Sequence, residues 1–243
     1  MTSPAKASES DIGFVLVHGA GFDVWVWDDV LSLIETPTLA ARFPGRDDDQ
    51  SVPDELRLSD YTDAVIEQID QWETSRVILV AHSIGGAVCM EVASRIADRV
   101  VGFIGVSAVI PEPGESFLSC FPLHQRLIQQ ALIRFAGTQP PEGIIRDSLC
   151  NALTDEQADR VVAEYIPESR YLFTDSVNGN IPAVTRRYIQ TSQDQSIKPK
   201  LQGKMATSLG TDDIVTLETG HLPMLSRPGE LASTLEEFSN QLR

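Results

Sequence analysis

Residues 77–90 read VILVAHSIGGAVCM, in which five apolar residues precede a segment with a histidine, a serine and two glycines, after which the chain is apolar again. The first half has the β-branched composition of a buried strand, and the second half has the apolar spacing of a helix. Ser83 lies between them, with Ala81 two positions before it and Gly85 two positions after it. A strand that turns this sharply into a helix accommodates only small side chains at those positions. The pattern therefore predicts a serine hydroxyl held at the end of a buried strand.

Segments typical of strands and helices alternate on both sides of this stretch. Helical apolar spacing is found over Leu58–Trp72 and Gly85–Ile96. The segments predicted to be strands are Gly13–Val17, Thr36–Ala41, Arg76–Ala81, Val100–Ile110, Arg187–Ser192 and Ile214–Glu218. Strands that alternate with helices form a parallel sheet, and a nearly continuous apolar strand is covered on both faces. We therefore predict an α/β fold with a mostly parallel twisted sheet and helices on both faces.

The alternation stops between Pro111 and about Pro182. Proline-rich breaks, PEPGES and GTQPPEG, flank two segments of helical pattern, Leu123–Phe135 and Asp155–Tyr165. The region is too short for an independent domain of typical size. We predict a single domain over residues 12–243, with its core at 12–110 and 183–243 and an inserted cap at about 111–182. Residues 1–11 are predicted to be a disordered N-terminus.

The residues around Ser83 form the G-x-S-x-G pattern of a nucleophile elbow, with alanine in the first position. A serine that only caps the following helix is the alternative. A nucleophilic serine needs a base, and the chain has four histidines. His18 belongs to an early glycine loop, His82 is the variable residue of the elbow and is expected to point away from the hydroxyl, and His124 lies in the cap. His221 follows the last predicted strand, at the sheet edge where parallel sheets gather active residues, and is predicted to be the base.

The base requires an acid that orients it, and the chain order in folds with this elbow is nucleophile, acid, histidine. Asp194 fits this order, because it follows a predicted strand at the same sheet edge and precedes His221 by one strand–helix–strand step. Asp212 and Asp213 lie at the start of the last strand, which is the opposite edge. Asp175, in the cap region, is the alternative acid.

Hydrolysis by a serine also requires two N–H donors for the oxyanion. The residue after the nucleophile supplies the Ile84 amide. The loop after the first strand supplies the Ala20 amide, because Gly19 lets the backbone turn toward the same point. His18 is interpreted as a structural residue that holds this loop by hydrogen bonds.

Four segments of the chain resemble the α/β-hydrolase superfamily, and within it the branch of plant methyl esterases and hydroxynitrile lyases with their bacterial esterase relatives. They are FVLVHGAGFDVWVW at 14–27, VAHSIGG at 80–86, YIQTSQDQSI at 188–197 and GHLPMLSRPGEL at 220–231. The resemblance begins at Phe14, covers nearly all of the remaining chain and fades in the cap. It implies a triad of Ser83, Asp194 and His221, since the third segment is the acid segment of that branch.

Two positions separate the esterases from the lyases in this resemblance. The lyases have threonine directly after the first-loop histidine and lysine directly after the catalytic histidine, where this chain has Gly19 and Leu222. Leucine cannot supply a positive charge to departing cyanide, while Gly19 is expected to leave room for an ester and a water. A serine-dependent carboxylic ester hydrolase is therefore predicted. Hydroxynitrile cleavage, lactone hydrolysis, carbon–carbon hydrolysis and a receptor-like binding protein remain alternatives.

Aromatic and apolar residues near the predicted edge are candidates for the acyl pocket, although each could equally pack the core. They are Phe22, Trp25, Phe117, Phe121, Leu222 and Met224. Such a lining favours small to medium apolar esters, aryl or methyl, as substrates.

The amino-acid composition limits the classes of ligand and partner that the protein is expected to bind. The chain has 19 Lys and Arg against 35 Asp and Glu, a net charge of −16, which disfavours nucleic acid, anionic membranes and anionic substrates. A neutral or cationic ligand is therefore expected. Cys89, Cys120 and Cys150 are odd in number and have no metal-binding spacing, so neither a disulfide framework nor a zinc site is predicted. A serine ester hydrolase needs no metal or other cofactor, and none is predicted. The N-terminus lacks the apolar segment of a signal peptide, which favours the cytoplasm, and the oligomeric state, a homodimer included, is left open.

Overall fold

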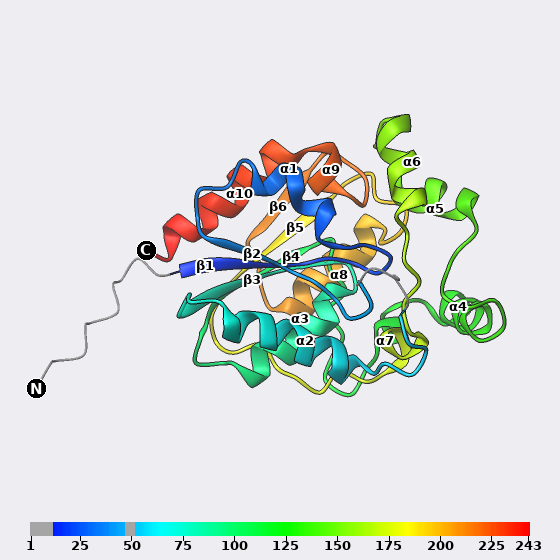
Figure 1. The fold of residues 1–243 in the computed structure, drawn as a ribbon, viewed down its shortest axis with the longest axis horizontal. Coiled ribbons are helices and arrows are strands. Elements are labelled where there is room, and N and C mark those ends of the chain that lie inside the picture. The colour runs from blue at the N-terminus through cyan, green and yellow to red at the C-terminus, as the bar shows by residue number, and fades with distance from the viewer. Residues whose placement is uncertain (1–11, 47–51) are drawn as a thin grey trace, which may run out of the picture.

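Strand β3 (Arg76–His82), which leads to Ser83, lies inside a six-stranded sheet in which all neighbouring strands are parallel (Figure 1). The computed structural model describes residues 12–46 and 52–243, so the N-terminal prediction for residues 1–11 lies outside the described residues. The strand order is β2-β1-β3-β4-β5-β6. The other strands are β1 (Ile12–Val17), β2 (Thr38–Ala41), β4 (Val100–Val106), β5 (Thr185–Thr191) and β6 (Ile214–Leu217). The predicted fold class is confirmed.

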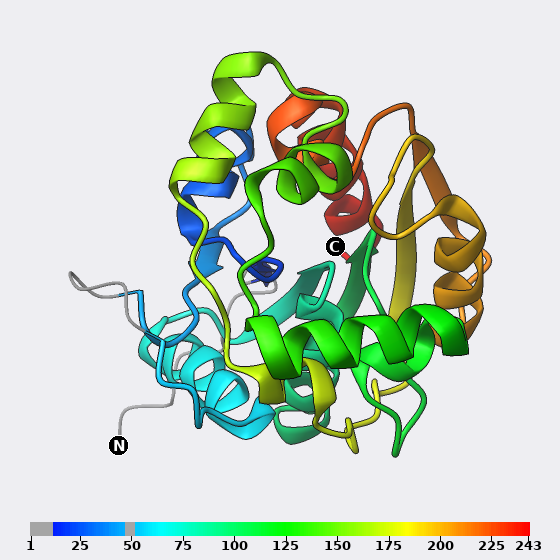
Figure 2. The same cartoon turned by 90° about the vertical axis from the view of Figure 1, so that its right-hand side faces the viewer.

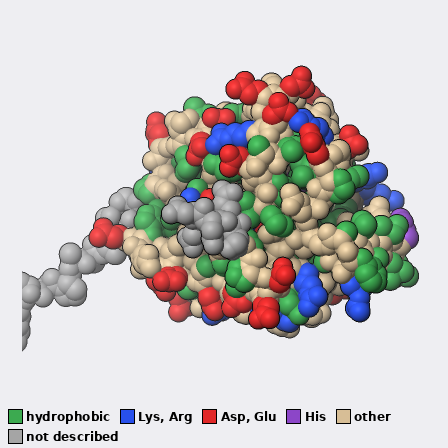
Figure 3. Space-filling view, turned by 45° about the vertical axis from the view of Figure 1, so that its right-hand side comes forward, with side chains coloured by type: hydrophobic (Ala, Val, Ile, Leu, Met, Phe, Trp, Pro, Cys, Tyr) green, Lys and Arg blue, Asp and Glu red, His purple; other side chains and the backbone are tan. Residues whose placement is uncertain are grey.

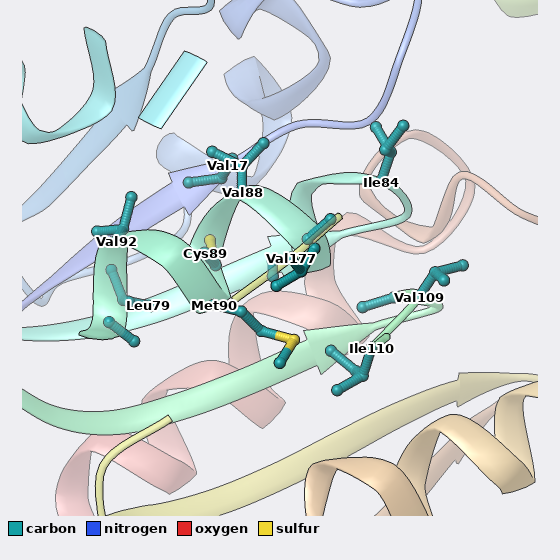
Figure 4. Close-up of a cluster of buried hydrophobic side chains, with 14 of the residues drawn as sticks. Val17, Leu79, Ile84, Val88, Cys89, Met90, Val92, Val109, Ile110 and Val177 are labelled. Atoms are coloured by element: carbon teal, nitrogen blue, oxygen red, sulfur yellow. The ribbon is translucent and has the colours of Figure 1, made fainter. Parts of the chain in front are cut away.

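The two faces of the sheet are covered by different helices, which explains why its strands are apolar without alternation. One face packs against α1 (Asp28–Leu31), α9 (Pro223–Ser226) and α10 (Pro228–Gln241). The other face packs against α2 (Leu58–Gln71), α3 (Gly85–Arg95) and α8 (Pro199–Leu209). Alternate residues of a strand enter opposite clusters: Leu16 lies in the first cluster and Val17 in the second. Figure 4 shows part of the second cluster, with Val17, Leu79 and Val88 between strands and helix.

Strand β4 ends at Val106, four residues before the predicted end at Ile110. Ser107 has a φ of 44°, a left-handed conformation that a strand cannot continue through. Residues Ala108–Ile110 stay fully buried, which is why their apolar side chains resembled a strand continuation.

The segment between β4 and β5 forms a series of helices at the carboxyl ends of the strands (Figure 2). These are η2 (Phe117–Cys120), α4 (Leu123–Ala136), α5 (Glu142–Leu149), α6 (Asp155–Ala163) and α7 (Arg170–Thr174). The sequence predicted α4 and α6 but not α5 and α7. Of the described helices, none is both long and apolar enough to cross a membrane.

Candidate active site

Ser83 occupies the turn between β3 and α3 with a φ of 55°, in the left-handed region that non-glycine residues rarely adopt. Backbone hydrogen bonds hold it there. Its N–H donates to the Val106 carbonyl at 3.3 Å, and its carbonyl accepts from the N–H of Gly86 at 3.1 Å and of Val109 at 2.9 Å. A β-carbon on Gly85 would approach the Val17 carbonyl to 2.9 Å, so the turn tolerates only a small residue there.

The imidazole of His221 and the carboxylate of Asp194 are joined at the same sheet edge. The distance from His221 Nδ1 to Asp194 Oδ2 is 2.7 Å, and both side chains are almost fully buried. Four further donors hold the carboxylate in one orientation. They are the Thr191 hydroxyl and Gln202 amide at Oδ2, both at 3.1 Å, and the N–H groups of Ser196 and Ile197 at Oδ1, both at 2.8 Å. The carboxylate is therefore aimed at His221 Nδ1, which leaves the other ring nitrogen, Nε2, for a second partner.

Asp175 and Asp213, two other aspartates considered for the acid of the triad, form ion pairs elsewhere. Asp175 pairs with Arg57 at 2.7 Å and accepts a hydrogen bond from the Leu58 N–H at the start of α2. Asp213 pairs with Arg187 at 2.9 Å beside the start of β6. Asp175 therefore anchors a helix end, a structural role away from His221.

The loop after β1 is pressed against the elbow. A β-carbon on Gly19 would lie 2.9 Å from both Ser83 Cβ and His82 Nδ1. Glycine is therefore required at this position by its close approach to His82 and Ser83, and the expectation that it leaves room for an ester and a water stays a prediction. Ala20 follows in this loop and Ile84 follows Ser83, so the two predicted amide donors lie at the ends of adjacent strands, β1 and β3.

A buried ion pair fastens the same loop to the cap. Arg46 and Glu168, both with fully buried side chains, form a bidentate pair. Glu168 Oε1 accepts from the Gly21 N–H at 3.1 Å, and Arg46 donates to the Phe22 carbonyl at 2.9 and 3.1 Å. The Tyr61 hydroxyl donates a hydrogen bond to Glu168 Oε2 at 3.1 Å. Burial of the Tyr61 side chain raises the pKa of its hydroxyl well above the usual range. Sequence reasoning missed this network, because Arg46 and Glu168 are far apart in the chain and neither lies in a motif.

Two buried histidines beside the site are held neutral. Burial, with a smaller contribution from the charge of Arg46, lowers the pKa of His18 to about 3. Burial also lowers the pKa of His82 well below its usual value, assisted by His221. His18 Nδ1 lies 2.8 Å from the Gly19 carbonyl and His82 Nε2 lies 3.0 Å from the His221 carbonyl. The neutral rings thus donate N–H groups to both loops, and His82 supports the backbone of His221, a role that the sequence did not suggest.

The depressed pKa of His18 predicts a specific pH dependence of stability. The pKa of His18 is 6.5 in the unfolded chain and about 3 in the folded protein. Between these pH values the unfolded chain binds a proton at His18 and the folded protein does not, so the free energy of unfolding decreases as the pH falls through this window, from 6.5 to about 3. Each pH unit in the window costs about 1.4 kcal/mol for one such histidine. His18→Asn keeps an N–H donor for the Gly19 carbonyl but does not titrate, and is expected to reduce this slope. Urea unfolding at a series of pH values measures it, with His124→Asn, in exposed α4, as the control. Equal slopes in His18→Asn and wild type would contradict the assignment.

The six residues predicted to line an acyl pocket are divided between the two buried hydrophobic clusters. Phe22, Leu222 and Met224 are at most 1% exposed and belong to the cluster under α1, α9 and α10. This burial is compatible with core packing as well as with a closed pocket, so their lining of an acyl pocket stays a prediction. Trp25 packs partly buried against that cluster and carries the Arg160 guanidinium over its ring at 4.1 Å.

Phe117 and Phe121 lie in the opposite cluster, with ring centroids 5.2 Å apart, and each keeps 8% exposure. Both belong to the cap and keep some exposed surface, and their lining of a pocket stays a prediction. Within residues 12–46 and 52–243, no group of three or more His, Cys, Asp or Glu side chains is placed to hold a metal ion.

A left-handed serine after a central strand, followed by an aspartate and a histidine joined at the same edge, is the arrangement of the α/β hydrolases. Residues 14–234 match the Alpha/beta hydrolase family, and the chain belongs to it. It is similar to methyl jasmonate esterase 1 of Vitis vinifera, at 27% identity over 93% of this chain and 95% of the relative. Norfluorocurarine synthase 2 of a Strychnos species is 23% identical over 94% of this chain and 96% of that protein. An extracellular α/β-hydrolase of a Paenibacillus species has the same fold, with a TM-score of 0.83 at 20% identity, covering 93% of this chain and 98% of that one.

Proposed function

We propose that the protein is a serine-dependent carboxylic ester hydrolase in which Ser83 is the nucleophile. The observation that carries the proposal is the 2.7 Å contact of His221 Nδ1 with Asp194 Oδ2, at the edge where Ser83 occupies its left-handed turn. Membership of the α/β hydrolase family and the similarity to an esterase support hydrolysis of an ester. Small to medium apolar esters, methyl or aryl, are the proposed substrates.

The residues divide the chemistry among them as follows. His221 Nε2 takes the proton of Ser83 as its Oγ attacks the ester carbonyl, and the amides of Ala20 and Ile84 donate to the oxyanion. Asp194 keeps the Nδ1–H tautomer of His221 and stabilises the imidazolium. His221 then protonates the leaving alkoxide, and the acyl group stays on Ser83. A water molecule activated by His221 releases the acid by the same steps.

A serine-directed sulfonyl fluoride or organophosphate is expected to label Ser83 alone, because Ser83 is the serine we place beside a base and oxyanion donors. Digestion followed by mass spectrometry locates the adduct. Turnover of p-nitrophenyl acetate, measured in parallel, distinguishes an enzyme from a binding protein that retains the triad. An adduct on another serine of the active protein, with Ser83 unmodified, would refute the assignment.

Hydroxynitrile cleavage is expected to be absent. Departing cyanide carries negative charge into a closed site, and Leu222, which follows His221, is apolar and 1% exposed. An unpaired charge beside such a wall costs several kcal/mol. In ester hydrolysis the leaving group is protonated as it departs, so the apolar wall does no harm. We expect hydrolysis of short aryl esters without cyanide release from mandelonitrile above the spontaneous rate. Cleavage of mandelonitrile faster than every ester in a panel would show that the lyase alternative is correct.

A further inference from the structure

A groove of about 810 Å³ lies between the cap helices α4 and α5 and the segment that leads into α8. Phe121, Ile144 and Leu201 contribute apolar surface to it, and Lys198, Lys200 and Lys204 line it as well. Figure 2 shows α4 in green and α8 in gold near the carboxyl ends of the strands, and residues of both helices line the groove.

The groove is basic in an acidic protein. The chain has four lysines at a net charge of −16, and the three within the described residues all line this groove. Its lining contains neither aspartate nor glutamate. In the part of the chain that the structure describes, these three ammonium groups have no carboxylate within 4.0 Å, although nine arginines are paired.

The neighbouring cap helix, α4, is also basic and also exposes apolar side chains. Helix α4, LHQRLIQQALIRFA, contains Arg126 and Arg134 and no acidic residue. Its exposed apolar side chains include Leu127 at 56% and Phe135 at 83% exposure. Figure 3 shows apolar and basic side chains together at the edge where α4 lies, whereas acidic side chains dominate the rim above and below. Positive charge thus coincides with apolar surface at one place.

This groove adjoins the acid segment of the site. Gln195 and Ser196, which line it, directly follow Asp194, and the Ser196 N–H donates to Asp194 Oδ1. Leu201 in the lining precedes Gln202, which donates to Asp194 Oδ2. A ligand in the groove therefore lies against the segment that carries Asp194, on the side of the sheet edge where the cap closes over it.

We propose that this lysine groove binds the anionic group of an amphiphilic ligand, and that the ester substrates carry a carboxylate or phosphate on their apolar chain. The substrate half of the proposal rests on the proposed function. Three clustered ammonium groups produce a local positive potential despite the negative net charge, and the apolar surface accepts the chain. The expectation of a neutral or cationic ligand, based on net charge alone, is replaced by an anionic one based on where the lysines lie.

Binding tests the groove without any hydrolysis. Calorimetry with decanoate, decyl phosphate, decanol and decyltrimethylammonium, below their micellar concentrations, is expected to show binding of the two anions, weakened by salt. Replacing one lysine by glutamine should weaken anion binding about threefold, and Lys198→Gln/Lys200→Gln/Lys204→Gln about 30-fold, the range of partly exposed ion contacts. Arg76→Gln removes the same charge at the exposed amino end of β3 and is the control. Comparison of decanoate with decyl phosphate shows which anion is preferred. Equal binding of decanol, or an equal loss in Arg76→Gln, would overturn the proposal.

Kinetics test the substrate class. The ratio of kcat/KM for the monomethyl ester of a long dicarboxylic acid to that for its dimethyl ester is expected to fall about 30-fold in the triple variant and to stay constant in Arg76→Gln. Different results would refute the proposed hydrolase activity and the proposed anion-binding groove. Anion binding with no turnover of any ester would refute the hydrolase while supporting the groove. Ester turnover without anion binding, and with an unchanged ratio in the triple variant, would refute the groove alone.

Discussion

Asparagine in place of Asp194 is expected to lower kcat/KM for a p-nitrophenyl ester by about four orders of magnitude while the protein still folds. The Asp194 carboxylate accepts hydrogen bonds from N–H and hydroxyl groups of residues 191–202, and its Oδ2 lies 2.7 Å from His221 Nδ1. An asparagine amide can direct its NH2 group at Nδ1, which selects the wrong imidazole tautomer and removes the charge that stabilises the imidazolium. Steady-state kinetics and a thermal melt measure the two effects.

Asp175→Asn is the matched control for this variant. It removes the same charge, but from a carboxylate that pairs with Arg57 and holds the start of α2. We expect a modest loss of stability and nearly wild-type kcat/KM. If Asp175→Asn inactivates the enzyme and Asp194→Asn does not, the acid comes from the cap and the strand-end argument is wrong.

Gly19→Ala is expected to lower kcat/KM by about two orders of magnitude, because even one added carbon has no room. The new β-carbon would meet Ser83 Cβ and the His82 ring at 2.9 Å. Either the nucleophile or the loop with the Ala20 amide must shift, and displacements of about 1 Å at a reacting group cost about 100-fold. The lyase-like change Gly19→Thr is expected to be worse, since it adds two further heavy atoms to the same gap.

The control for Gly19→Ala is Gly229→Ala in α10, where an added β-carbon meets no atom within 4 Å. It is expected to be neutral or slightly stabilising, because alanine restricts the unfolded chain. KM and kcat measured separately show where the loss arises, and a defect in the oxyanion loop predicts a fall in kcat. Full activity in Gly19→Ala would mean that the loop and the elbow are less tightly packed than the structure shows.

Short sequence patterns were sufficient to predict the strands of the sheet, but they did not predict all the helices of the cap. The strands were predictable because each is a short apolar run between turn residues, and Asp194 and His221 could be proposed because both follow strands at one edge. Helix α5 was missed because GTQPPEG was interpreted as a break, although Pro141 directly precedes α5 and proline is tolerated where a helix begins. The roles proposed for Ser83, Ala20 and Ile84 stay predictions.

Other contacts could not be predicted because they join distant segments. The aromatic lining was proposed from residue type alone, and the structure places Phe22 and Phe117 in different hydrophobic clusters. The sequence places Lys198, Lys200 and Lys204 within seven residues, but it could not reveal that α4 and α5 form a groove against them. The pairing of Arg46 with Glu168 spans 122 residues and leaves no local pattern.

That ion pair limits how the cap can diverge or be exchanged. A cap transplanted from a relative would have to bring its own carboxylate to the position of Glu168, since a fully buried guanidinium left without its partner costs about 3–5 kcal/mol. The same carboxylate holds the Gly21 N–H of the loop that carries Ala20. Recombination of caps within this family would therefore change the geometry of the reaction centre as well as the choice of substrate, unless Arg46 and its acceptor are inherited together.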